Sequence, residues 1–89
     1  MTLNKTFSAL NDPTRRTILD LLKKRDLSVA EIAQHFSITL PTLSHHLSAL
    51  KDADLVTAQR QGTQMIYSLN LSVFEAVAKE LYAFFNHKK

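Results

Sequence analysis

Apolar residues recur at helical spacing in three stretches of the first half of the chain, and polar residues separate these stretches. We expect helices over residues 3–10, 13–24 and 29–35. The second stretch follows Asp12, an N-cap residue, and begins with proline, whose missing N–H costs nothing at the first helical position. Ser28 starts a capping box in front of the third stretch. The pattern therefore predicts three short helices with few residues between them.

A fourth helical pattern follows a predicted turn at residues 37–38, with Thr39 as its cap and a proline in its first turn. Its inward face repeats at i, i+3, i+4 and i+7 and consists of Leu43, His46, Leu47 and Leu50. Its opposite face carries short side chains that form hydrogen bonds, namely Thr42, His45, Ser48 and Asp52, with Ser44 and Lys51 at the edge. A helix divided in this way packs through one face and offers the other to a ligand.

Two strands and a last helix complete the pattern. Residues 55–60 and 64–69 are predicted strands around a glycine-containing turn, so they form a β-hairpin. Ser72 begins a second capping box, which predicts a final helix through about Asn86. The order of four helices, a hairpin and a helix is that of a winged helix-turn-helix. We therefore expect a mainly α fold with a β-hairpin, in one domain over residues 1–89.

The composition narrows the class of protein. The chain has 89 residues, 45% of them hydrophobic, which suits one globular domain. The lack of cysteine excludes disulfides, thiolate metal sites and thiol catalysis. No apolar run approaches ~18 residues and no signal peptide is visible, so we expect a cytoplasmic protein without membrane insertion. Residues 1–51 hold seven basic and four acidic residues, a balance compatible with a polyanionic partner.

The chain resembles the ArsR-type winged-helix transcriptional repressors in three segments, DPTRRTILDLL, SITLPTLSHHLSALKDADLV and GTQMIYSL. Among these repressors it is similar to the small SdpR-like autorepressors that lack a metal site, over about residues 3–85. The resemblance implies a homodimer that binds double-stranded DNA at an inverted-repeat operator and represses transcription, often of its own operon. The family commonly has glycine where this chain has Asp54, so we expect a less sharply terminated fourth helix.

The fourth helix is the predicted recognition helix. Its short hydroxyl and imidazole side chains are suited to base edges and phosphates, and its Thr methyls and Leu40 to a thymine methyl. The predicted DNA-contacting residues are Thr39, Leu40, Pro41, Thr42, Ser44, His45, Ser48 and Lys51. A solvated helix face is the alternative, but the position after a capped helix and a turn, and before a wing, favours DNA contact.

The hairpin tip and the second helix add basic and polar candidates. The predicted wing residues are Arg60, Gln61, Gly62, Thr63 and Gln64, in which an arginine suits a phosphate or a narrow minor groove. Ordinary solvation is the alternative for the wing. Arg15 and Arg16 stand in the first turn of the second helix, where positive charge opposes the helix dipole, so another purpose is expected. Phosphate contact and a salt bridge to Asp12 or Asp20 are the two alternatives.

The last helix carries an apolar stripe wider than one small core requires. Exposed aromatic residues at this density imply a partner surface. With the first helix they predict a two-fold dimer interface, which is also how the family uses these two helices. The predicted interface residues are Leu3, Phe7, Phe74, Val77, Ala78, Leu81, Tyr82 and Phe85. Packing inside one chain is the alternative, and Phe74 and Leu81 are suited to both.

Other functions fit the sequence less well. His45 and His46 point about 100° apart on a helix and do not converge on a metal ion, so we expect His46 inward with a hydrogen-bond partner and His45 outward. We expect neither metal nor cofactor. Without a glycine-rich phosphate loop, paired carboxylates or a Cys/His pair, an enzyme is not expected. The competing hypothesis is a winged-helix module for protein–protein contact. For release from DNA, a small-molecule inducer and a sequestering protein are both open, the latter permitted by the resemblance.

Overall fold

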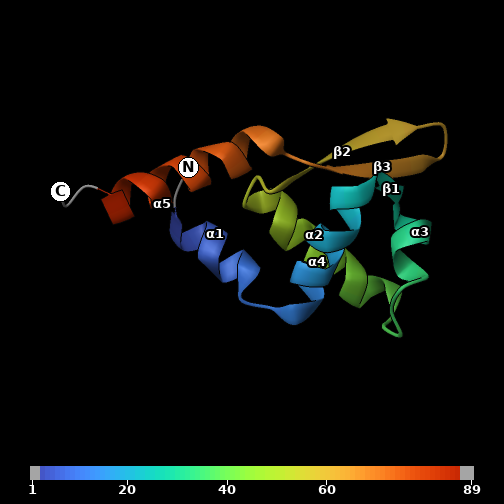
Figure 1. Cartoon of the computed structure of the whole chain (residues 1–89). Helices are drawn as coiled ribbons and strands as arrows, with labels where there is room; N and C mark the ends of the chain where they lie inside the picture. The colour runs from blue at the N-terminus through green and yellow to red at the C-terminus, as the bar shows by residue number, and fades with distance from the viewer. Residues whose placement is uncertain (1–2, 87–89) are drawn as a thin grey trace.

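A computed structural model of the protein describes the backbone of residues 3–86 and the side chains of residues 4–86. Within this range the elements are, in chain order, α1 (Leu3–Leu10), α2 (Pro13–Lys24), β1 (Leu27–Ser28), α3 (Val29–Ala33), α4 (Leu40–Asp52), β2 (Val56–Gln61), β3 (Gln64–Leu69) and α5 (Leu71–Asn86). The predicted order of four helices, a hairpin and a helix is confirmed, with one short strand added (Figure 1).

Three helix N-termini are capped as the sequence indicates. The Oδ1 atom of Asp12 accepts a hydrogen bond of 3.1 Å from a backbone N–H in the first turn of α2. Ser28 and Glu31 form the reciprocal capping box, with bonds of 2.9 and 3.1 Å between each side chain and the other residue's N–H. The Oγ1 atom of Thr39 accepts from the N–H of Thr42 at 3.4 Å. Each bond satisfies a backbone donor that the helix itself leaves free.

Two predicted helix ends differ from the structure. α3 ends at Ala33 rather than near His35, because the N–H of His35 bonds at 3.0 Å to the carbonyl three residues before it, which tightens the chain into a turn. α5 begins at Leu71, and N–H groups of its first turn bond to the carbonyl of Asn70. The predicted capping box at Ser72 is therefore wrong, since Ser72 lies inside the first turn.

β1 is the element that the sequence pattern did not predict. It pairs antiparallel with β3, where Leu27 lies opposite Tyr67, and completes a three-stranded sheet of order β1-β3-β2. β2 pairs with β3 along its whole length, up to Gln61 opposite Gln64 at the tip. β3 is thus bonded on both sides, and its middle is joined to the segment that enters α3.

The core lies where α2, α3 and α4 meet the base of the hairpin. The most deeply buried side chains include Ile18, Ile32, Leu43, Leu47, Leu50, Leu55 and Val56. Three of them come from α4, so the predicted apolar face of this helix is confirmed as the face that packs on the body. The opposite face of α4 is consequently left to solvent.

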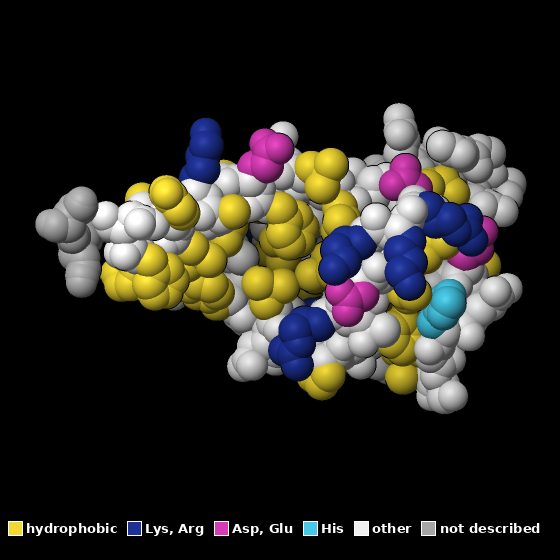
Figure 2. Space-filling model, in the orientation of Figure 1, with side chains coloured by type: hydrophobic (Ala, Val, Ile, Leu, Met, Phe, Trp, Pro, Cys, Tyr) yellow, Lys and Arg dark blue, Asp and Glu magenta, His cyan; other side chains and the backbone are white. Residues whose placement is uncertain are grey.

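α5 extends away from this core. Val77 is buried, at 9% exposure, whereas Tyr82 and Phe85 are 71% and 72% exposed. In Figure 1 the C-terminal half of α5 reaches beyond the rest of the protein, and the molecule measures 51 × 24 × 20 Å. Figure 2 shows hydrophobic side chains gathered at this end. Among the described residues, none of the helices is both long and apolar enough to span a membrane.

Candidate nucleic-acid interface

α4 presents an exposed side built from short polar side chains. The predicted contact residues of this helix are all exposed: Thr39, Leu40, Pro41, Thr42, Ser44, His45, Ser48 and Lys51. On the other side of the helix, Leu43, Leu47 and Leu50 are at most 2% exposed. The structure therefore brings the predicted set together on the solvent side of one helix that is fixed from behind.

The start of α4 holds two hydroxyl groups in a defined orientation. The Oγ1 atom of Thr39 accepts from the N–H of Thr42 and donates to the Oγ1 atom of Thr42 at 2.9 Å. Because the Thr42 hydroxyl oxygen accepts this bond, its own hydrogen remains available to an outside acceptor, such as a phosphate oxygen or a purine N7. The first turn of α4 thus offers a donor directed by the helix cap.

The two adjacent histidines of α4 divide as predicted. His45 is exposed, whereas the side chain of His46 is 14% exposed. The Nδ1 atom of His46 accepts a hydrogen bond of 3.2 Å from the Nε–H group of Arg15. Since Nδ1 accepts, the neutral ring carries its hydrogen on Nε2. The inward position and the hydrogen-bond partner are both confirmed.

Asp12 is the third member of this group. Its Oδ1 atom, which caps α2, lies 3.9 Å from the Nδ1 atom of His46. The backbone N–H of Arg15, which donates to this carboxylate, holds the pKa of Asp12 below its usual value, against the opposing effect of desolvation. One carboxylate therefore caps α2 and contacts α4. Within residues 3–86, no three His, Cys, Asp or Glu side chains gather closely enough to hold a metal ion.

Both arginines of α2 have hydrogen bonds within the chain. Arg15 bonds to His46, and Nη1 of Arg16 donates to the carbonyl of Leu10 at 2.7 Å. Asp20, one of the salt-bridge partners considered for them, pairs with Lys23 at 3.5 Å instead. Sequence reasoning missed the bond between Arg15 and His46 because the two residues are 31 positions apart. Each bond uses one of five guanidinium donors, so phosphate contact stays a prediction for both arginines.

The tip of the hairpin forms an exposed wing. Residues 60–64 are all exposed, and Gly62 has a φ of +65°. Because Gln61 lies opposite Gln64, the turn has two residues, and a positive φ at the first of them is typical of a type II′ hairpin turn. In Figure 1 the wing tip and the turn before α4 both lie at the end of the molecule remote from the C-terminal half of α5. The wing and the start of α4 therefore share one end of the protein.

The predicted dimer residues are distributed unevenly. Phe7, Ala78, Leu81, Tyr82 and Phe85 are exposed in the single chain, Phe74 is half-buried and Val77 is buried, while the side chain of Leu3 lies outside the described residues. Phe84, which the predicted set omitted, is exposed and meets Phe85 edge to face at 5.4 Å between ring centroids. Its signal in the sequence is its place in the same apolar stripe. Leu81, Phe84 and Phe7 line one hollow, so α1 and α5 jointly form this apolar surface.

Comparison with known proteins adds independent findings. Residues 12–58 match the family model described as bacterial regulatory protein, arsR family. The chain is 44% identical over 84 residues to the transcriptional repressor SdpR of Bacillus subtilis (strain 168), an alignment that covers 94% of this chain and 93% of that protein. The family match spans α2, α3 and α4, so it includes Arg15, Arg16 and the whole exposed side of α4.

Solved structures show the same fold. An ArsR-like transcriptional regulator from Rhodococcus sp. RHA1 superposes with a TM-score of 0.87 at 27% identity, covering 96% of this chain and 80% of that chain. The homodimeric winged helix-turn-helix DNA-binding domain of a Mycobacterium bovis protein superposes with a TM-score of 0.72 at 31% identity, covering 98% of this chain and 87% of that one. Both alignments extend over nearly the whole chain, α1 and α5 included.

Proposed function

Because the chain belongs to the ArsR family of bacterial regulatory proteins, whose members bind DNA as homodimers, we propose that it represses transcription from an inverted-repeat operator, including that of its own operon. The relative SdpR is named a transcriptional repressor, which supports the direction of regulation. The protein is a DNA-binding regulator and not an enzyme. We also propose that it acts in the cytoplasm, where a bacterial regulator meets its DNA.

The exposed side of α4 is the observation that carries the proposal. Its apolar face is buried, its first turn is capped by Thr39, and His46 is held from behind by Arg15. What remains outward is a row of hydroxyl and imidazole groups, with the wing at the same end of the molecule. A rigid helix with short polar side chains and a neighbouring β-hairpin fits the major groove and the adjacent backbone.

Two-fold symmetry determines the form of the operator. We place the dimer axis at the apolar surface of α1 and α5, which lies away from the wing tip. A two-fold axis gives each half of the DNA site an identical recognition helix. Two such helices about one turn of DNA apart, ~34 Å, require half-sites that are inverted repeats.

Alanine at both Thr42 and His45 tests the recognition helix. Each side chain is exposed, so the double variant should fold and dimerise normally while its operator affinity falls by about 100-fold, as expected for losing two contacts of roughly 1–3 kcal/mol each. Electrophoretic mobility shift and sedimentation measure the two properties. Thr57→Ala, which removes an exposed threonine outside the predicted set, serves as the control and should bind like the parent protein. Unchanged affinity and sequence preference in the double variant would remove α4 from the proposal.

Salt dependence separates DNA binding from the competing protein-contact module. Each phosphate contact on duplex DNA contributes about −0.9 to the slope of log K against log salt concentration. With several phosphate contacts, we therefore expect the affinity for duplex DNA to fall steeply as the salt concentration rises from about 50 to about 200 mM. A module that only contacts proteins would bind no duplex even at low salt, and this result would favour the alternative.

A further inference from the structure

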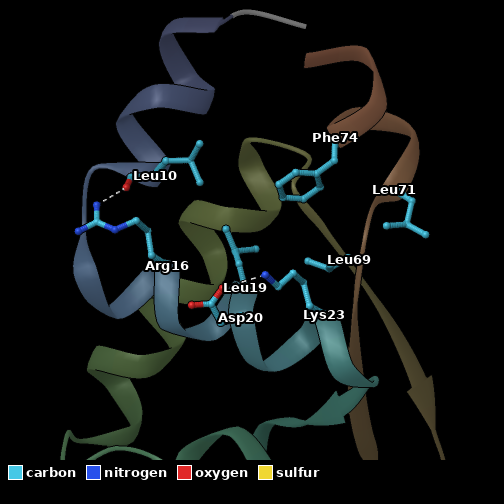
Figure 3. Close-up of a pocket in the computed structure, with 8 residues that line it drawn as sticks. All are labelled: Leu10, Arg16, Leu19, Asp20, Lys23, Leu69, Leu71 and Phe74. Atoms are coloured by element: carbon cyan, nitrogen blue, oxygen red, sulfur yellow. Dashed lines mark hydrogen bonds and ion pairs between the residues drawn. The ribbon is translucent and has the colours of Figure 1, made fainter. Parts of the chain in front are cut away.

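A hollow of about 500 Å³ lies between α2 and the start of α5, and repression as proposed above gives it no role (Figure 3). Its lining residues are Leu10, Leu19, Leu69, Leu71 and Phe74, which are apolar, together with Arg16, Asp20 and Lys23. We call it the α2–α5 pocket. In Figure 3 the side chains of Leu10, Leu19 and Phe74 point toward one another across it. Its volume is within the range of small-molecule sites, about 300–1,000 Å³.

The α2 side of this pocket is basic. Arg16 donates to the carbonyl of Leu10 at one edge, and the Nζ atom of Lys23 lies 3.5 Å from Oδ1 of Asp20. The side chains of Lys23 and Asp20 are 68% and 72% exposed, so this ion pair is solvated and readily exchanged for another partner. Two cations and one carboxylate leave one net positive charge beside an apolar interior. This combination is complementary to a monoanion whose body is apolar.

The pocket joins the two parts of the molecule that the proposed function uses. One wall is α2, whose Asp12 and Arg15 hold His46 of the recognition helix. The other wall is the first turn of α5, the helix that carries the apolar dimer surface. A ligand that contacts both walls would therefore change how α5 is set against α2 and α4.

We propose that the α2–α5 pocket binds a small amphipathic monocarboxylate, with its alkyl chain among the apolar side chains and its carboxylate at Lys23 and Arg16, and that this binding weakens operator affinity. The effect on the operator rests on the proposed function. The binding itself does not, because it is measured on the protein without DNA.

Sodium octanoate is the first probe. Its binding is measured by NMR on the protein without DNA. We expect saturable shifts at Leu19 and Leu69, one site per chain, and affinity that rises about fourfold for each added methylene from hexanoate to decanoate. Octan-1-ol has the same chain without the charge and should bind at least about tenfold more weakly, as expected for losing a charge-assisted contact. Equal binding of acid and alcohol, affinity independent of chain length, or shifts centred on Phe84 and Phe85 would overturn the proposal.

Two neighbouring lysines supply a matched pair of variants. Lys23→Gln removes a cation that lines the pocket and leaves Asp20 uncompensated, so octanoate should bind at least about tenfold more weakly. Lys24→Gln removes an exposed cation that does not line the pocket and should bind octanoate like the parent. Leu71→Glu puts a carboxylate at the apolar wall, where the N-terminus of α5 tolerates it, and should abolish binding. Equal loss or no loss across the two lysine variants would overturn the assignment of Lys23.

Operator binding with and without octanoate tests the regulatory half. We expect saturating octanoate to lower the affinity of the parent protein at least about fivefold, and to leave Leu71→Glu unaffected, as a coupling between two sites requires. Octanoate that binds in the pocket without changing operator affinity would overturn the regulatory half. A protein that binds no operator under any condition would overturn the proposed function, and the NMR result would still decide whether the pocket takes a monocarboxylate.

Discussion

At the scale of single residues, Asp54 determines how α4 ends. Its φ of +60° lies in the left-handed region, where glycine is the usual residue. Two hydrogen bonds close the end of the helix. The N–H of Asp54 donates to the carbonyl of Lys51 at 2.9 Å, and the N–H of Leu55 donates to the carbonyl of Leu50 at 3.0 Å. These are the two bonds of a Schellman motif, and Leu50 and Leu55 are both fully buried. The expectation of a less sharply terminated helix was wrong, because burial of Leu55 holds an aspartate in a conformation suited to glycine.

Glycine at position 54 should stabilise the protein. A non-glycine residue in the left-handed conformation costs roughly 1–2 kcal/mol at most, and Asp54→Gly removes this cost. Glycine also makes the unfolded chain more flexible, which opposes folding by about 0.5–1 kcal/mol. We expect the free energy of unfolding to rise by about 0.5 kcal/mol and the Tm by a few degrees. Asp54→Ala keeps the Cβ atom and should lower both quantities. Thermal unfolding at one chain concentration makes the comparison, and a glycine variant no more stable than the alanine variant would contradict it.

At the scale of elements, local sequence patterns predicted each of the longer helices and strands. The short strand β1 and the partner of His46 depend instead on contacts between segments that are distant in the sequence. The caps at Asp12, Ser28 and Thr39 involve residues three apart, so spacing alone identified them. β1 is two residues long and exists because β3 offers it a free edge, which no periodicity records. The outward side of α4 followed from the same pattern that located its core face. The Arg15 partner of His46 did not, since it depends on how α2 packs on α4.

The carboxylate that caps α2 makes a prediction about pH. The pKa of Asp12 is lowered in the folded protein, so its charge stabilises the fold above the ordinary value of 3.8, and this stabilisation is lost as the pH falls through the lower folded value. Asp12→Asn keeps a capping oxygen and removes the charge. We expect it to be less stable than the parent at pH 7, by about 0.5 kcal/mol.

Urea unfolding at several pH values tests this expectation. The difference between the parent and Asp12→Asn should shrink as the pH falls below 3.8 and through the lower folded pKa of Asp12, because both proteins carry a neutral cap below that value. A difference that stays constant over this range would show that the amide itself, rather than the lost charge, disturbs the cap.

At the scale of the whole molecule, the chain has a well-packed end and an unpacked end. The helix-turn-helix and the base of the hairpin surround one core, while the C-terminal half of α5 exposes large aromatic side chains (Figure 2). Exposed apolar surface of this kind is typical of a contact between chains. The sequence indicated this surface from the width of the stripe, but which residues of α5 already pack within the chain, Val77 above all, is determined by the fold.

Charges on the exposed aromatic face should separate the dimer. Tyr82 and Phe85 lie outside the core of the single chain, so Tyr82→Glu with Phe85→Glu should leave each chain folded while burying two carboxylates in the proposed interface. We expect a monomer by sedimentation at micromolar concentration and loss of operator binding. Lys79→Glu adds a carboxylate at an exposed position of α5 outside the predicted set and should remain dimeric. A dimeric double variant would place the interface elsewhere.

The unpacked end of α5 has a consequence for gene dosage. While most chains are monomers, the concentration of dimer rises with the square of the chain concentration. A twofold change in synthesis therefore gives about a fourfold change in the dimer, the species proposed to bind the operator. Occupancy then climbs over a narrow interval of expression instead of gradually. If the operator controls the gene for this chain, the gene is transcribed until that interval is reached and is then repressed sharply. The exposed aromatic side chains of α5 would thus set the protein concentration at which repression begins.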